Sequence, residues 1–174
     1  MWRKVLPDYE YRFYNDSMIF KWFDEHFPTY AEFTRTIRNG GALADIFRYA
    51  VLYIEGGVYV DIDTVPHRRF PDYMLRYCQW CILAKPRHPA LLDAFLCALG
   101  NMKDRPWGDV ISNTGPVMWT QVINQWKARH DPGKLSTLIL PCEYFCAGSG
   151  LCVPVTNHTI LMHQFAGTWR HKQK

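Results

Sequence analysis

The stretch that most constrains the fold is GALADIFRYAVLYIEGGVYVDIDT, residues 41–64. Apolar residues recur at helical spacing over residues 42–54, so this part is predicted to form a helix with a broad apolar face. A Gly-Gly pair follows, and glycines commonly end helices. Residues 58–62 are mostly β-branched or aromatic, which predicts a strand. The stretch therefore predicts a helix, a turn and a strand in immediate succession.

The predicted strand ends in two carboxylates, Asp61 and Asp63, separated by one isoleucine. Because side chains in a strand alternate between faces, Tyr59 and both aspartates are expected on one face, and the aliphatic residues, Ile62 included, in the core. The two aspartate Cα atoms would lie about 6.6 Å apart, which suits two carboxylates flanking one divalent cation. Oxygen ligands favour Mn²⁺ or Mg²⁺. The alternative is that the strand ends at Asp61 and that both carboxylates are solvated turn residues.

The preceding helix carries a charged pair, Asp45 and Arg48, on a mostly apolar surface. Residues three apart are neighbours on a helix, and charged side chains on a largely buried helix need partners. One interpretation is an intrahelical salt bridge, which contributes little to stability. The other is that the pair faces the same cleft as the two aspartates, where the arginine could bind a phosphate or a sugar hydroxyl.

The rest of the sequence predicts helices that alternate with short strands, which is typical of an α/β protein. No repeat, low-complexity tract or linker divides the chain, so a single domain is expected over residues 1–174. Asn15 or Asp16 is expected to cap the first helix and Pro28 to end it. Helices are expected at residues 15–27, 89–101 and 116–129, and further strands at 80–84, 138–140 and 160–163.

The charge and hydropathy pattern excludes two kinds of partner. The net charge is only +4 and no long Lys/Arg run is present, so we expect no nucleic-acid partner. The best candidate for a membrane span is interrupted by Asp45, Arg48 and Glu55, so we expect no transmembrane segment in this chain. The first residues do not resemble a targeting signal. A soluble protein is expected, unless the chain is a piece of something longer.

The six cysteines are interpreted as buried thiols of a protein in a reducing compartment, which favours a cytoplasmic location. Cys78 and Cys81 form a C-x-x-C pair, and the alternative is a zinc site. Such a site needs a second pair at matching spacing, and Cys142 with Cys146 is a loose match.

The motif-bearing stretch ADIFRYAVLYIEGGVYVDIDT resembles the signature of glycosyltransferase family thirty-two, the D-x-D enzymes. That family includes fungal initiating mannosyltransferases, inositol-phosphoceramide mannosyltransferases and α-1,4-galactosyltransferases, and the stretch is also similar to one in the clostridial glucosylating toxins. NTGP (113–116), MHQFAGTW (162–169) and LPDYEYRFYND (6–16) resemble further family elements. The resemblance therefore spans most of the chain.

The resemblance implies a GT-A-type α/β fold, with a mixed central sheet flanked by helices. It also implies metal-dependent, retaining transfer of a hexose from a UDP- or GDP-sugar to a glycan, glycolipid or protein acceptor. Family members usually begin with a strand that lines the nucleotide-base pocket, and this chain starts after that point, so an N-terminally short version is expected. If the chain is a piece of an anchored enzyme, the resemblance implies the Golgi lumen instead of the cytoplasm.

Two other functions compete with an active transferase. The missing first strand favours a catalytically inactive remnant that binds sugar nucleotides without turning them over. A metal-dependent phosphohydrolase could also use the aspartate pair, although such enzymes usually supply a denser cluster of carboxylates and histidines.

The resemblance assigns the candidate catalytic residues one by one. Asp63 would bind the metal directly, while Asp61 would reach the metal through water and contact the donor's ribose or sugar. Asp45 and Arg48 would hold hydroxyls of the donor sugar, and Tyr59 would line the donor pocket.

The resemblance extends these assignments to three other segments of the chain. His163 would be a metal ligand or a diphosphate contact, and Trp169, with the threonine before it, would close over the diphosphate. Packing in the core is the alternative for both residues. The acceptor side would be formed by Asn113, Thr114 and Gly115, and by variable loops around residues 105–113 and 143–155.

Overall fold

The computed structural model describes residues 1–68, 79–130 and 155–164. The helices are α1 (Trp2–Val5), α2 (Asp16–His26), α3 (Pro28–Thr36), α4 (Gly40–Glu55), α5 (Pro89–Asp104), α6 (Val110–Asn113) and α7 (Pro116–Ala128). The strands are β1 (Gly57–Val60), β2 (Thr64–Pro66), β3 (Cys81–Ala84) and β4 (Leu161–His163). The predictions of a strand at residues 138–140 and of roles for Trp169 and the residue before it lie outside the described residues. None of the helices described is both long and apolar enough to span a bilayer.

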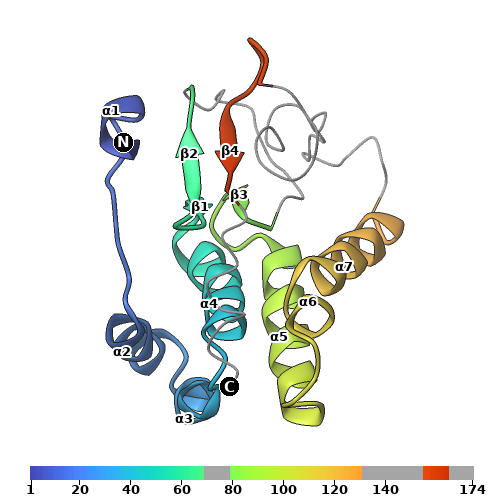
Figure 1. Ribbon diagram of the computed structural model, residues 1–174. Helices are drawn as coiled ribbons and strands as arrows, with labels where there is room; N and C mark the ends of the chain where they lie inside the picture. The colour runs from blue at the N-terminus through green and yellow to red at the C-terminus, as the bar shows by residue number, and fades with distance from the viewer. Residues whose placement is uncertain (69–78, 131–154, 165–174) are drawn as a thin grey trace.

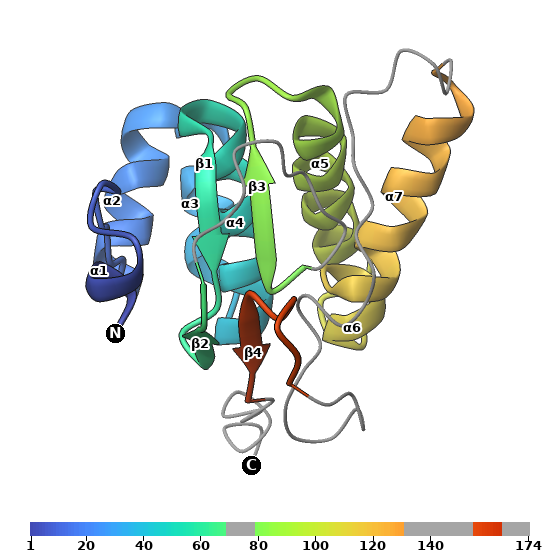
Figure 2. The same ribbon diagram turned by 90° about the horizontal axis from the view of Figure 1, so that it is seen from above.

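The molecule has two layers, with helices α2 to α7 gathered on one side of β1 and β3 (Figures 1 and 2). Helix α4 lies at the centre of the helical layer beside α5 (Figure 1). Every residue of α4 from Asp45 to Leu52 is buried, so this helix meets neighbours around most of its circumference. Asp45 and Arg48 therefore sit inside the protein rather than on its surface.

The predicted helix at residues 15–27 is confirmed as α2, and the Asn15 side chain caps it by accepting a hydrogen bond from the Met18 backbone N–H. Pro28 does more than end this helix. It also opens α3, a helix that was not predicted. Proline is well tolerated in the first turn of a helix, because the N–H groups there have no partner within the helix. The aromatic ring of Phe23 on α2 packs against Phe95 of α5 and joins these helices to the main core.

The strands form two antiparallel pairs, β1 with β3 and β2 with β4, so the described residues show no mixed sheet of the expected kind. The predicted strand at residues 58–62 ends early, at Val60. A turn follows, in which the Thr64 backbone N–H and hydroxyl both donate to the Asp61 carbonyl. The expectation that Ile62 points into the core is therefore wrong: it lies at the tip of this turn and is 87% exposed.

The turn between α4 and β1 depends on glycine, as predicted. Gly56 has φ of 69°, a region that favours glycine, and caps α4. A Cβ atom at this position would lie 2.5 Å from Cδ of Pro86, so the chain passes too close for any side chain. This turn directs the chain from α4 straight into β1 and on to the two aspartates.

The far face of β1 packs on a second, smaller core cluster that includes Cys81, Leu161 and the half-buried Val58 and Val60. Cys81 is buried there, as expected for a thiol that packs as a small apolar side chain. The expectation of burial is wrong for Cys97, which is exposed on α5. Its position in the sequence falls on the outer face of that helix, where its small side chain needs no burial.

Candidate active site

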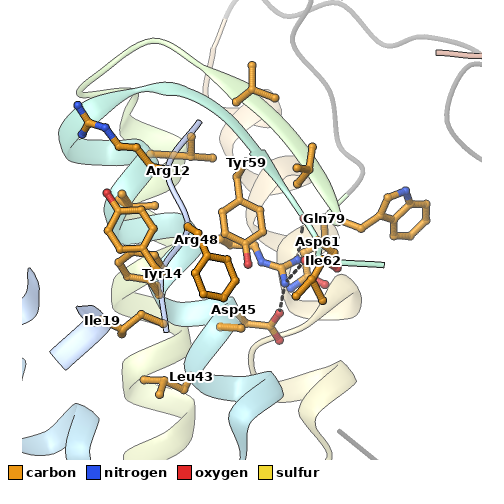
Figure 3. A pocket seen from close by; sticks show the side chains of 18 of the residues that line it. Arg12, Tyr14, Ile19, Leu43, Asp45, Arg48, Tyr59, Asp61, Ile62 and Gln79 are labelled. Atoms are coloured by element: carbon orange, nitrogen blue, oxygen red, sulfur yellow. Dashed lines mark hydrogen bonds and ion pairs between the residues drawn. The ribbon is translucent and has the colours of Figure 1, made fainter. Parts of the chain in front are cut away.

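An open cleft of about 1610 Å³ crosses the molecule between the N-terminal segment, α4 and the end of β1. Figure 3 shows Arg48 projecting from α4 between Asp45 and Asp61, with the ring of Tyr59 beside it. The cleft is lined by seven of the residues singled out in the sequence: Asp45, Arg48, Tyr59, Asp61, Asp63, Gly115 and His163.

Arg48 contacts two carboxylates and one backbone carbonyl in the cleft, although only 4% of its surface is exposed. One terminal nitrogen, Nη2, lies 2.8 Å from Asp61 Oδ1 and 3.1 Å from Asp45 Oδ1. The other, Nη1, donates to the backbone carbonyl of Gln79 at 2.7 Å. Arg48 therefore pairs with Asp45 within the helix, and the pair also faces the cleft that contains the D-x-D aspartates. A contact from Arg48 to a phosphate or sugar hydroxyl stays a prediction.

Asp45 is buried, and its second carboxylate oxygen accepts a hydrogen bond from the Thr114 hydroxyl at 2.7 Å. Burial raises the pKa of Asp45 to about 6, because desolvation of the carboxylate outweighs the opposing effects of Arg48 and Thr114. Asp45 is therefore a carboxyl group whose charge is sensitive to pH near neutrality.

Tyr59 is held beneath the guanidinium of Arg48, with 4.8 Å between the carbon at the centre of that group and the ring centroid. Burial raises the pKa of Tyr59 to about 12, so the phenol stays neutral. Burial also opposes the charge on Arg48, but Asp61, Tyr59 and Asp45 together raise the pKa of Arg48 above its usual value. The cleft thus contains a permanent, well-compensated positive charge.

Asp61, Asp63 and His163 could hold a metal ion, because one ligand atom from each lies within 4.8 Å of the others. His163 Nε2 lies 3.3 Å from Asp63 Oδ1 and 3.6 Å from Asp61 Oδ2. Burial disfavours the Asp61 anion, but Arg48 and His163 more than offset this and lower the pKa of Asp61. Two carboxylate oxygens and one imidazole nitrogen fit a divalent cation such as Mn²⁺, and suit Mg²⁺ less well because of the imidazole.

The three residues of the Asn-Thr-Gly element differ in whether they line the cleft. Gly115 lines the cleft, whereas Asn113 and Thr114 are buried beneath it. The Asn113 side chain donates to the Arg105 carbonyl and so holds the turn before α6. Thr114 contacts Asp45 from below, and an acceptor-side role for this element stays a prediction.

Two contributors to the site, Gln79 and Trp80, were missed in the sequence. Gln79 accepts from Arg48 through its backbone carbonyl, and the Trp80 ring lies 5.1 Å from the His163 ring. The available signal was a polar residue between two cysteines just before a buried strand. That pattern is equally typical of a solvated turn, so it could not have identified them.

The first 80 residues match the family described as a glycosyltransferase sugar-binding region containing a DXD motif. This match includes α4, β1 and both aspartates of the cleft. The chain is related to the D-x-D glycosyltransferases. The resemblance seen in the sequence is thereby confirmed.

Two curated relatives show how far the similarity extends. The initiation-specific α-1,6-mannosyltransferase of Schizosaccharomyces pombe is 25% identical, over 73% of this chain and 46% of its own length. The mannosyl phosphorylinositol ceramide synthase SUR1 of Saccharomyces cerevisiae is 27% identical, over 80% of this chain and 40% of its own length. The chain thus spans less than half the length of these two relatives.

Among solved structures, the PaToxG glycosyltransferase superimposes with a TM-score of 0.50 and 22% identity. The superposition covers 68% of this chain and 46% of that one. At this level of identity the likeness establishes the fold alone. Together with the antiparallel strand pairs and the helical layer, it shows an α/β fold of the GT-A glycosyltransferase type.

Proposed function

We propose that the chain is a metal-dependent glycosyltransferase that moves a hexose from a UDP- or GDP-sugar to a glycan, lipid or protein acceptor. The observation that carries this proposal is the convergence of Asp45, Arg48, Asp61, Asp63 and His163 in one cleft. The names of the curated relatives, which describe mannosyl transfer, support a sugar donor. Retention at the anomeric carbon is proposed from the family resemblance alone.

Asp63 and His163 would hold Mn²⁺ or Mg²⁺ together with Asp61, directly or through water. A bound divalent cation would supply positive charge where the leaving diphosphate accumulates negative charge. Arg48 holds Asp61 at 2.8 Å, so this carboxylate is fixed in place before a donor arrives. Such preorganisation is effective because the groups need not reorient during the reaction.

Asp45 would contact the donor sugar. Both of its carboxylate oxygens already accept a contact, one from Arg48 and one from Thr114. A carboxylate oxygen can accept two hydrogen bonds, so Asp45 retains the capacity to bind a sugar hydroxyl at the wall of the cleft. Tyr59 would line the pocket beside it, and Trp169 would close over the diphosphate.

We further propose that residues 1–174 act as one catalytic domain, in support of which one core cluster extends from Ile19 to Trp126. The location stays a prediction, cytoplasmic or Golgi-luminal. A phosphohydrolase is not favoured, because in the parts of the chain that the structure describes the metal-binding candidates amount to Asp61, Asp63 and His163.

The proposal is tested by donor hydrolysis, screened over UDP- and GDP-sugars with and without Mn²⁺. Wild type is compared with Asp63→Ala and with Asp104→Ala, which removes an exposed carboxylate at the end of α5, away from the cleft. We expect metal-dependent release of UDP or GDP that falls at least 100-fold in Asp63→Ala, on the order of the loss of an electrostatic contact to the transition state. Asp104→Ala should match wild type.

Intact donors in the presence of folded wild-type protein would contradict an active transferase. If that protein still bound Mn²⁺ and a nucleoside diphosphate, as measured by titration calorimetry, the inactive remnant would be the correct description. Equal hydrolysis by wild type and Asp63→Ala would show that the D-x-D aspartate does not carry the reaction.

A further inference from the structure

We propose that Gln79 is a positioning residue, whose buried side chain fixes the two backbone carbonyls that hold Arg48 and Asp61. This inference rests on the proposed function and names a residue that acts through the donor-binding side chains without touching the donor. The hydrogen bonds of Gln79 also connect two motifs noted in the sequence, CQWC and NTGP, whose relation to each other was otherwise unexplained.

The side chain of Gln79 is 6% exposed and is anchored at two points. Its amide nitrogen donates to the Tyr49 hydroxyl at 2.8 Å and to the Thr114 carbonyl at 3.1 Å. The Tyr49 hydroxyl in turn donates to the same Thr114 carbonyl at 2.9 Å. The three groups form a closed set of hydrogen bonds between α4, the segment before β3 and the turn before α7.

The backbone next to this anchor binds both charged partners of the site. The Gln79 carbonyl accepts from Arg48 at 2.7 Å, and the next carbonyl, that of Trp80, accepts from the Asp61 backbone N–H at 3.0 Å. The position of the Gln79 side chain therefore sets where Arg48 and Asp61 lie relative to each other.

Asp45 is tied to the same set from its other side. Thr114 presents its carbonyl to Gln79 and its hydroxyl to Asp45. A shift of the Thr114 backbone would move the hydroxyl that holds Asp45. Transfer reactions lose rate steeply when groups are misplaced by about 1 Å. The amide of Gln79 should therefore matter for donor handling, although this residue is only 6% exposed at the wall of the cleft.

A purely structural explanation makes a different prediction. If Gln79 only satisfies buried polar groups, its loss lowers the folded fraction and weakens every ligand equally. If it positions Arg48, Asp45 and Asp61, its loss should weaken contacts to the donor's sugar more than those of the metal and diphosphate, because Asp63 and His163 would still hold the cation.

The decisive experiment compares two affinities in each variant: that of the donor identified by the hydrolysis screen, and that of its nucleoside diphosphate, both with Mn²⁺. Gln79→Met removes the amide while keeping most of the side-chain length. Leu99→Ala serves as a stability-matched control, because Leu99 is buried in α5 and does not line the cleft. Calorimetry is run at a temperature at which circular dichroism shows all variants folded.

We expect Gln79→Met to weaken the donor at least tenfold more than it weakens the nucleoside diphosphate, and Leu99→Ala to leave both affinities unchanged. Thr114→Val, which removes the hydroxyl without changing the shape, should show the same selective loss, and Thr114→Ser should restore it. Combining Gln79→Met with Asp45→Asn should cost less than the two single losses together, because both act on one set of contacts.

Parallel loss of both affinities in Gln79→Met, or no loss in either, overturns the positioning role while the proposed function stands. Wild type that binds neither donor nor nucleoside diphosphate overturns the proposed function itself, and this inference with it. The positioning role is therefore tested by Gln79→Met, whereas the proposed function is tested by wild type.

Discussion

Arg48 shows how a buried charge can be held on a helix that is otherwise almost entirely apolar. Its guanidinium contacts two carboxylates and one carbonyl, and its face lies over an aromatic ring. Removing one partner of such a buried set leaves the remaining charges uncompensated, which is more costly than the net contribution of the pair. Arg48, Asp45 and Asp61 therefore depend on one another, because the loss of one leaves the buried charges of the others uncompensated.

The raised pKa of Asp45 predicts how stability depends on pH. Its ordinary value is 3.8 and its value in the folded protein about 6. Between these values the folded state retains a proton that the unfolded state has released, so the free energy of unfolding should fall as pH rises from about 4 to about 6. The contribution of Asp45 to this fall is about 3 kcal/mol.

The test is urea unfolding of wild type and Asp45→Asn at several pH values in this window. Because asparagine does not titrate, the stability of wild type relative to the variant should decrease with rising pH and level off above pH 6 or so. A difference that stays constant with pH would show that Asp45 does not retain its proton in the folded state.

At the scale of elements, alanine is predicted to have opposite effects on stability at two glycines, Gly56 in the turn between α4 and β1 and Gly100 in α5. Gly56→Ala should destabilise the protein by more than about 1 kcal/mol, because φ is 69° and Pro86 leaves no space for Cβ. Gly100→Ala in α5 meets nothing within 4 Å and should stabilise by up to about 1 kcal/mol. Thermal unfolding of both variants checks the pair, and equal shifts in Tm would contradict this account.

The helices were largely predictable from the sequence, since local signals determine them. Asn15, the Gly-Gly pair and Pro116 each act within one turn of chain. The strand ends were not predictable. Whether residues 61–63 continue β1 or turn away depends on the contacts of Asp61 with Trp80 and Arg48, which come from other elements.

The same limit applies to the site. The sequence indicated Asp45, Arg48 and the D-x-D pair because they are charges within an apolar stretch, and the structure brings them together with His163. It placed Thr114 on the acceptor side and did not indicate that this residue supports Asp45, and it gave no signal for Gln79, since a glutamine beside a strand has no distinctive pattern. Those partners are set by tertiary packing, through contacts between residues distant in sequence.

At the scale of the whole molecule, the candidate metal site joins the turn after β1 to the end of β4. A ligand that binds only the folded state stabilises it, by about 2.7 kcal/mol at one hundred times its dissociation constant. Mn²⁺ should therefore raise the Tm of wild type and of Asp104→Ala. It should have no such effect on Asp63→Ala or His163→Ala, which lose a ligand; an equal rise in all four proteins would place the metal elsewhere.

The pairing of Thr64 with His163 has a consequence for the order of folding. The helical core joins segments such as α2 and α5 that lie closer in sequence than these two residues. Thr64 and His163 are roughly one hundred positions apart, so closing the loop between them carries a somewhat larger entropic cost. The helices can therefore collapse into a compact intermediate while β4 is still detached. Such an intermediate would already contain Arg48 and both aspartates of the D-x-D pair, but it would lack the imidazole of His163. Metal affinity would then be acquired only in the last step of folding. A bound cation would therefore stabilise the finished structure rather than initiate its folding.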